Sequence, residues 1–205
     1  MSRASFSADR ALTCGVCGAP APPPFRAPPA EQAPDLDLRP GEPTRSTLPR
    51  WLLTCRRCGA VAPDLAALPS AAAATTESEP YRALPASPAR PFLRWAMLCS
   101  GHAAAEATLQ AAWALDDAND PAAASLRRQA AALWGEPGTP ESALRLIDVL
   151  RRGGDFTAAA AIDLSDTDET SARLLAFQRE RIAAADTARY LISAAPSAPP
   201  PAPPT

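Results

Sequence analysis

Two short stretches, Cys14-Gly15-Val16-Cys17-Gly18 and Cys55-Arg56-Arg57-Cys58-Gly59, decide how the rest of this chain is organised. Each stretch places two cysteines three positions apart, so that one tight turn can aim both thiols at a single metal ion. The glycine after each pair tolerates the positive φ that such a turn requires. Two pairs supply four soft ligands, the full set of a closed tetrahedral zinc site. The sequence therefore predicts structural Zn²⁺ bound by Cys14, Cys17, Cys55 and Cys58.

Length, charge and cysteine usage limit the number of domains, the class of partner and the cellular compartment that we expect. The chain has 205 residues, enough for one sizeable domain or two small ones. All of its 20 basic residues are arginine, and a net charge of −2 gives no overall attraction to nucleic acid or an anionic membrane. Four of the five cysteines belong to the pairs, which is typical of a reducing compartment. Residues 1–10 are polar, and no stretch approaches the roughly 20 apolar residues of a membrane span, so we expect a cytoplasmic protein.

The first 66 residues predict a small metal-binding module. Short strands are expected at residues 10–13, 51–54 and 60–62, leading into or out of the two cysteine turns. Residues 20–34 contain seven prolines and therefore predict an extended loop. This loop makes the spacing between the pairs long, but the entropic cost of closing a loop grows only logarithmically with its length. We interpret residues 1–66 as a zinc-ribbon-like module, with the metal replacing most of a core.

Inside that loop lies the run Pro34-Asp35-Leu36-Asp37-Leu38-Arg39-Pro40. Its leucines alternate with its aspartates, a pattern that favours an edge strand with the leucines turned inward. We interpret Asp35, Asp37, Arg39 and Arg45 as possible contacts to a ligand or partner. A salt bridge within an exposed edge is the alternative interpretation.

Taken together, the run from Cys14 through Pro34–Pro40 and Arg45-Ser46-Thr47 to Cys55–Ala62 resembles an uncharacterised bacterial protein family. In that family a paired C-x-x-C module precedes a helical, tetratricopeptide-like region. The resemblance covers about the first 66 residues well and the helical part loosely. It implies metal binding and this architecture, and it carries no activity. Arg56-Arg57 stands where that family has a proline and a small polar residue, which leaves the metal ligands undisturbed.

The remainder of the chain predicts helices. Residues 67–87 are rich in small residues and proline and predict a linker. Residues 88–193 predict an all-α domain, and residues 194–205 a disordered proline-rich tail. Asp120-Pro121 and Thr139-Pro140 each combine an N-cap residue with a proline suited to the first helical turn. The expected helices cover residues 91–100, 102–118, 121–134, 140–152, a short stretch from 155, and 168–185.

A weak repetition runs through these helices. Residues 113–115 followed by 119–124 resemble residues 148–150 followed by 154–159, at an offset of 35 residues. Tetratricopeptide repeats have a period of 34 residues. A plain helical bundle with coincidental turns is the alternative. The predicted fold is thus a small β zinc ribbon followed by an all-α, tetratricopeptide-like domain, α-dominated overall.

Few residues suggest chemistry beyond metal binding. His102, the sole histidine, stands at a helix start, where a capping or solvent-exposed role is expected, and Cys99 is expected to be a small buried hydrophobe. Four cysteine ligands leave a zinc ion no open position for catalysis. Residues 1–66 carry eight arginines and six acidic residues, and the −2 charge of a zinc–tetrathiolate centre brings the module close to neutral. We interpret Arg56 and Arg57 as balancing that centre.

These observations favour a non-catalytic zinc-binding protein that acts as a protein–protein interaction or scaffold module. Its partner is expected to be a protein, with no membrane involved. One alternative is a zinc-ribbon protein that binds nucleic acid or is associated with transcription. A second alternative is a cryptic enzyme or an enzyme accessory subunit. The near-neutral charge of the metal module argues against nucleic acid as the partner, because zinc ribbons that bind nucleic acid carry a clear excess of positive charge.

Overall fold

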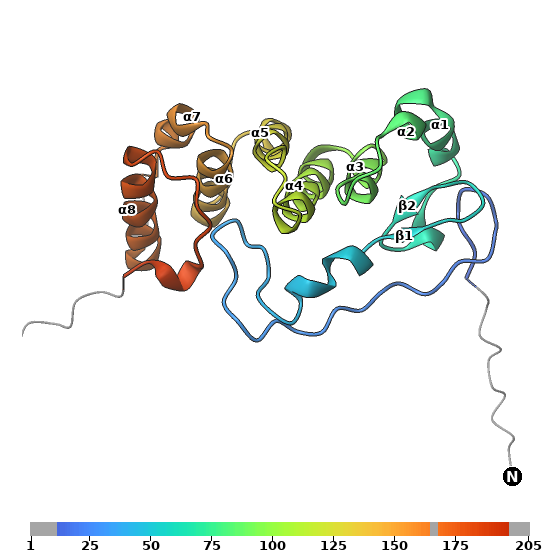
Figure 1. The fold of residues 1–205 in the computed structure, drawn as a ribbon, viewed down its shortest axis with the longest axis horizontal. Coiled ribbons are helices and arrows are strands. Elements are labelled where there is room, and N and C mark those ends of the chain that lie inside the picture. The colour runs from blue at the N-terminus through green and yellow to red at the C-terminus, as the bar shows by residue number, and fades with distance from the viewer. Residues whose placement is uncertain (1–11, 165–167, 197–205) are drawn as a thin grey trace, which may run out of the picture.

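The computed structural model describes residues 12–164 and 168–196 (Figure 1). Within these residues the fold is mostly helical, with one antiparallel pair of two-residue strands, β1 (Leu53–Thr54) and β2 (Val61–Ala62). The 3-10 helices are η1 (Arg45–Arg50), η2 (Leu65–Ala67) and η3 (Ile192–Ala194). The α-helices are α1 (Ala72–Glu77), α2 (Glu79–Ala83), α3 (Arg90–Ala96), α4 (Gly101–Asp117), α5 (Ala123–Trp134), α6 (Pro140–Arg152), α7 (Phe156–Ala161) and α8 (Glu169–Ala183).

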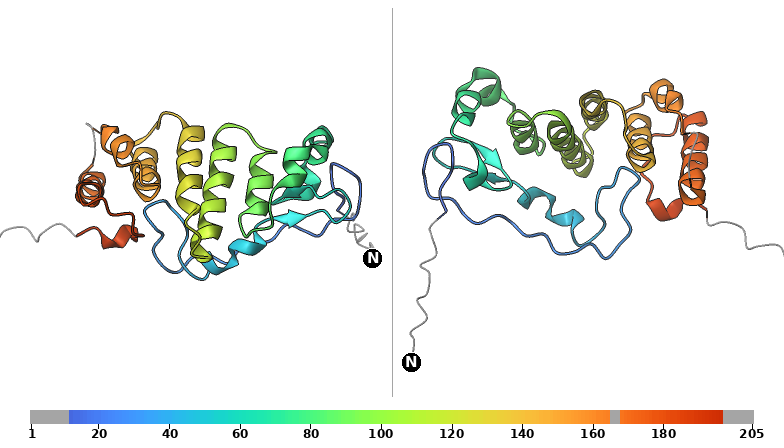
Figure 2. Two further views of the ribbon diagram at one scale, coloured as in Figure 1. Left: turned by 45° about the horizontal axis from the view of Figure 1, so that its top comes forward. Right: turned by 180° about the vertical axis from the view of Figure 1, so that it is seen from behind.

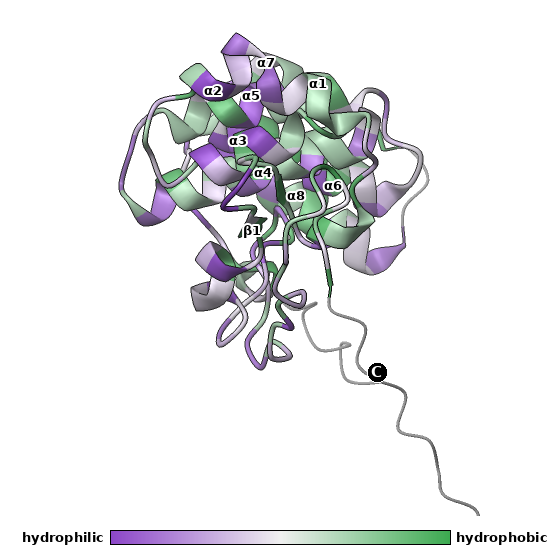
Figure 3. Ribbon diagram, turned by 90° about the vertical axis from the view of Figure 1, so that its right-hand side faces the viewer, coloured by the Kyte–Doolittle hydropathy of each residue, from purple (hydrophilic) through white to green (hydrophobic). Residues whose placement is uncertain are grey.

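Helices α3 to α7 stand side by side in a row, and α8 packs against α6 and α7 at one end (Figure 1). The cysteine turns, the β1–β2 hairpin and helices α1 and α2 lie at the other end. From there residues 20–44 run beneath the row as far as α6, and the chain returns through η1 to β1 (Figure 2). Viewed from the cysteine end, the helices form an upper layer (Figure 3). Residues 20–52, called the returning segment below, form a lower layer. The fold therefore has a long connection laid along one face of a helical row.

Three α-helices begin with a side-chain cap, and the first of these caps was predicted. Thr139 accepts a hydrogen bond from the Ser142 backbone N–H and so caps α6, while Pro140 occupies its first turn. Asp155 and Asp168 cap α7 and α8 in the same way. The prediction that Asp120 caps the next helix was wrong. The Asp120 carboxylate accepts from the Ala122 N–H within a separate turn, and α5 begins only at Ala123.

The same turn ends α4, α6 and α8. In each, a residue with positive φ follows the helix, namely Asn119 (54°), Gly154 (76°) and Ala185 (51°). The next residue is always an aspartate, whose N–H donates over 2.9 Å to a carbonyl five positions earlier. This bond satisfies a carbonyl that the helix end would otherwise leave unpaired. The first two turns stand at the predicted offset of 35 residues, and the third was not predicted.

Three apolar clusters hold the layers together. The largest lies among α3, α4 and α5 and is covered from below by Leu48, Trp51 and Leu52 of the returning segment. Its centre is Trp113, against which Trp51 stacks edge-on with ring centres 6.4 Å apart. A second cluster joins the cysteine turns to Trp95 and Leu98, around the end of α3. The third lies among α6, α7 and α8.

One secondary-structure prediction was wrong. Residues 35–39 form a turn rather than an edge strand, with Leu36 buried and Leu38 44% exposed at a φ of 62°. Residues 67–87, predicted to be a linker, contain α1 and α2, and the alanine run of α1 favours helix. The division into units 1–66 and 88–193 stays a prediction. The tail beyond residue 196 and the first part of the strand expected at 10–13 lie outside the described residues, and Thr13 makes a single bridge to Pro20.

Candidate metal centre

Four thiols from the two cysteine pairs meet beside the β1–β2 hairpin. The Sγ atoms of Cys14 and Cys58 lie 3.9 Å apart, and those of Cys17 and Cys55 lie 3.6 Å apart. All four Sγ atoms lie within 4.8 Å of one another, and none belongs to a disulfide. A tetrahedral site with Zn–S bonds of about 2.3 Å separates its sulfurs by about 3.8 Å. The donor atoms and their spacing therefore fit a metal ion held by four thiolates.

Both cysteine pairs use one backbone turn. The Gly18 N–H donates to the Cys14 carbonyl over 2.7 Å, and the Gly59 N–H donates to the Cys55 carbonyl over 2.9 Å. In both turns the N–H of the first cysteine donates over 2.8 Å to the carbonyl of the residue after the glycine. Gly18 and Gly59 have φ values of 71° and 74°, as the sequence predicted. The two halves of the site are thus built alike.

The surroundings of the two turns differ. The Gly15 N–H donates over 2.9 Å to the Leu65 carbonyl, and a Cβ atom at Gly15 would lie 1.9 Å from the Leu68 carbonyl oxygen. The first turn is therefore pressed against η2 and accepts only glycine at that position. The second turn is held from the other side, where the Tyr81 hydroxyl donates over 3.0 Å to the Gly59 carbonyl. Sequence reasoning missed both contacts, because they join the turns to residues outside the cysteine motifs.

The second turn also favours a thiolate. Burial alone would raise the pKa of Cys55, but the backbone N–H groups of Cys58 and Arg57 lower it to about 7. Burial raises the pKa of Cys58 to about 12, and the neighbouring thiols add to this rise. A metal ion binding here must displace the thiol protons.

The segment predicted as a partner contact lies in the interior, beneath α4, α5 and α6. Asp37 has no exposed surface, and it accepts hydrogen bonds from Arg152 Nη1 over 2.8 Å and from Trp113 Nε1 over 2.9 Å. Arg127 lies 3.5 Å from the same carboxylate. Burial alone would raise the pKa of Asp37, but the guanidinium groups of Arg152 and Arg127 hold this pKa below its usual value. Asp37 is thus an internal anion bound by the helices.

The other three residues of that prediction are also paired within the chain. Arg39 forms an ion pair with Asp117 and donates over 3.2 Å to the Trp113 carbonyl. Arg45 donates over 2.9 Å to Asp35, which is buried. A role for these residues in partner binding stays a prediction. Because Asp35, Asp37 and Arg39 are all buried, the charges of this segment stabilise the fold rather than face solvent.

Sequence reasoning missed the charged residues that receive this segment. Arg127 and Arg152 both bond to Asp116, and Arg151 donates over 2.6 Å to Asp148. Burial, and next the nearby charge of Asp37, raise the pKa of Asp148 to about 6. A usable signal was the position of Asp148, Arg151 and Arg152 among the apolar residues of α6. Charged residues within an apolar stripe are buried only when they are paired.

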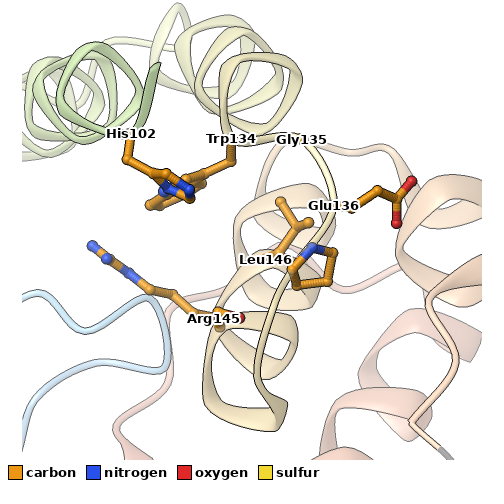
Figure 4. A pocket seen from close by; sticks show the side chains of 8 residues that line it. His102, Trp134, Gly135, Glu136, Arg145 and Leu146 are labelled. Atoms are coloured by element: carbon orange, nitrogen blue, oxygen red, sulfur yellow. The ribbon is translucent and has the colours of Figure 1, made fainter. Parts of the chain in front are cut away.

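His102 lies at the exposed start of α4, in agreement with its predicted solvent role. Its side chain lines a hollow of about 220 Å³ together with Trp134 and Arg145 (Figure 4). Arg145 already has partners within the chain. Its guanidinium carbon lies 4.7 Å from the Trp134 ring centre, and the guanidinium group forms an ion pair with Glu106. The partly buried Cys99 is not among the four clustered thiols, and burial raises its pKa.

Comparisons with known proteins found no matching family model, curated protein or solved structure. The cysteine cluster and the helices of the predicted architecture are present, whereas membership of the bacterial family stays a prediction. No helix within residues 12–164 and 168–196 is long and apolar enough to cross a membrane.

Proposed function

We propose that the four cysteines hold structural Zn²⁺ and that the protein is a non-catalytic protein–protein interaction or scaffold module. The observation that carries this proposal is the donor set. Four thiols at tetrahedral spacing, delivered by two matching turns, fill every position of a zinc ion and leave none for a substrate. A centre of this kind organises the chain around it.

The position of the proposed metal supports this proposal, because the metal would hold a long connection in place. The cysteine turns stand at both ends of the connection formed by residues 18–54, and the middle of that connection is bonded to α6 at Asp37. Zinc at its two ends and buried ion pairs at its middle would together hold this long irregular segment in one position. Small domains use metals for this purpose, because their cores are too small to order such segments alone.

We further propose that α4–α5 and α6–α7 are two degenerate helix pairs of tetratricopeptide type. The shared turn at Asn119-Asp120 and Gly154-Asp155, offset by 35 residues, supports this proposal. Stacked helix pairs form extended surfaces that bind other proteins. Here the lower face of the row is covered by residues 34–52, so the available surfaces are the upper face and the returning segment itself.

The test compares the intact protein with a double Cys14→Ser/Cys58→Ser variant in affinity capture from the native host. Any captured protein is then purified and recombined with both forms. We expect one zinc per chain in the wild type, and a partner that binds the wild type saturably and the variant weakly. A captured set with no member that binds in reconstitution would overturn the scaffold role. Full metal content in the variant would overturn the zinc assignment.

A further inference from the structure

We propose that a groove beside the metal centre binds an acidic, extended segment of a partner protein. This inference rests on the proposed interaction function and names the chemistry of the partner. The groove consists of two adjoining hollows of about 760 and 730 Å³ that share Leu52 and Leu53 as their floor. One wall is the proline-rich run Pro20–Phe25, and the other includes Arg56 and Arg57 of the second cysteine turn.

Four arginines line the groove and no aspartate or glutamate does, while Cys55 in its lining belongs to the metal centre. Among the described residues Arg26, Arg50 and Arg56 take part in no ion pair or side-chain hydrogen bond, and Arg57 makes only a 3.5 Å contact to the Cys17 carbonyl. Even with the −2 charge of a zinc–tetrathiolate centre beside it, the groove keeps an excess of two positive charges. Exposed arginines that have no acidic partner among the described residues favour carboxylate ligands, which they bind through paired N–H groups.

These arginines differ from those on the lower face of the helical row. Arg127, Arg151 and Arg152 are all bonded to aspartates of this chain. The side chain of Arg50 is also positioned, because its guanidinium carbon lies 4.3 Å from the centre of the Phe25 ring. The groove is therefore the part of the lower layer where positive charge stays available to another molecule.

An open strand edge indicates how a partner segment would lie. Strand β1 pairs with β2 on one side only among the described residues. Cys55 bonds to Ala60, and because antiparallel pairs alternate, the N–H and C=O of Thr54 point away from β2. Thr54 is exposed and lines the groove. An extended peptide can add to such an edge through main-chain hydrogen bonds, while its alternate side chains select the partner.

The apolar floor favours a peptide over nucleic acid. Leu52 and Leu53 are half-buried and suit apolar side chains placed between acidic ones. Single-stranded nucleic acid is bound by stacking its bases on exposed aromatic rings. The one aromatic ring in the lining, Phe25, is already covered by Arg50. The partner segment is therefore expected to alternate acidic and apolar residues.

The test is a titration of the full, zinc-loaded protein into a fluorescein-labelled peptide of three tandem Glu-Leu-Asp-Ser units, followed by fluorescence anisotropy. The test variant is Arg26→Gln/Arg56→Gln, which removes two unbonded charges and leaves the contacts of Arg50 and Arg57 intact. The control is Arg82→Gln/Arg173→Gln, which removes two charges from α2 and α8, outside the lining of the groove. We expect saturable binding that weakens about tenfold or more in the test variant, as for two lost charge-assisted contacts. Binding by the control variant should not change.

Two further probes decide the chemistry. A peptide of Glu-Ser-Asp-Ser units should bind several-fold more weakly, because it keeps the charge and loses the apolar side chains. An oligothymidylate of equal length should bind more weakly than the first peptide. Tighter binding of the oligothymidylate, with the same loss in the test variant, would make this a nucleic-acid site and overturn the proposal. Equal peptide affinity in the wild type and the test variant would also overturn it, and reconstitution with a captured partner would still decide the interaction function separately.

Discussion

Replacing Asp37 by asparagine removes the charge that joins the returning segment to the helical row. The wild-type carboxylate is fully buried and touches Arg152, Arg127 and the Trp113 indole N–H. Removing one partner of a buried ion pair costs about 3–5 kcal/mol, because the remaining charge is left uncompensated. Two features place the expected loss near the lower limit. Asparagine can still accept the hydrogen bond from Trp113, and the substitution relieves the repulsion that Asp37 exerts on Asp116 and Asp148.

We therefore expect Asp37→Asn to lower the free energy of unfolding by about 3 kcal/mol, a large fraction of the roughly 5–15 kcal/mol of an ordinary domain. For a chain of this size that loss corresponds to a fall in Tm of roughly 6–12 °C. The measurement is urea unfolding at pH 7.5, followed by circular dichroism at 222 nm and by tryptophan fluorescence. Coincident transitions of the two signals would justify a two-state treatment.

The control is Glu180→Gln, which removes the partner of Arg181 from an ion pair at the surface. The two side chains are 69% and 32% exposed, so the pair is screened by solvent and its loss should cost less than about 1 kcal/mol. Equal losses in the two variants would refute the reasoning. They would mean that Asp37 does not fasten the segment and that the buried arginines find other compensation.

Three further predictions concern charge and metal. Between pH 4 and pH 7.5 the stability of Asp148→Asn relative to the wild type should rise by about 2 kcal/mol, measured by urea unfolding at both values. The sign follows because burial raises the folded-state pKa of Asp148 from 3.8 to about 6, so wild-type stability falls as pH rises through that window. Elemental analysis should show one zinc per chain that Cys55→Ser loses and Cys99→Ser keeps; a variant at Cys55 with full metal content would disprove the ligand set. Chelation should unfold the cysteine module while more than about half of the 222 nm signal survives, because α4–α8 have their own apolar clusters; a larger loss would show that residues 1–66 and 88–193 share one folding unit.

Features with local signals could be predicted from the sequence. The cysteine pairs carry their own turn residues, and Thr139, Asp155 and Asp168 cap helices through bonds to residues three positions later. Such contacts depend on the order of neighbouring residues and little else. The recurrence at an offset of 35 residues was visible for the same reason. The need for glycine at position 15 was not visible, because it comes from the Leu68 carbonyl, 53 positions later.

The segment at residues 35–39 shows why local pattern was insufficient. Alternation predicted leucines inside and aspartates outside, but Asp37 is buried and Leu38 is exposed. The reason lies on the helices. Arg127 and Arg152 are both buried and both bond to Asp116, so their two positive charges share one carboxylate until Asp37 supplies a second. Buried charge must be paired, and this requirement outweighs the burial of a single leucine.

This pairing also bears on where a partner can bind. Asp37 and Arg39 form ion pairs with residues of α4 and α6, and Asp35 pairs with Arg45, so these charges are engaged within the chain, and their role in partner binding stays a prediction. Four arginines line the groove around Leu52 and Leu53. Among the described residues, none of them forms an ion pair with an aspartate or a glutamate. If Asp37 fastens the segment and those arginines bind the partner, Asp37→Asn should lower stability without changing peptide affinity at temperatures below its transition. Arg26→Gln/Arg56→Gln should do the reverse, and the two properties would then be shown to reside in separate residues of the chain.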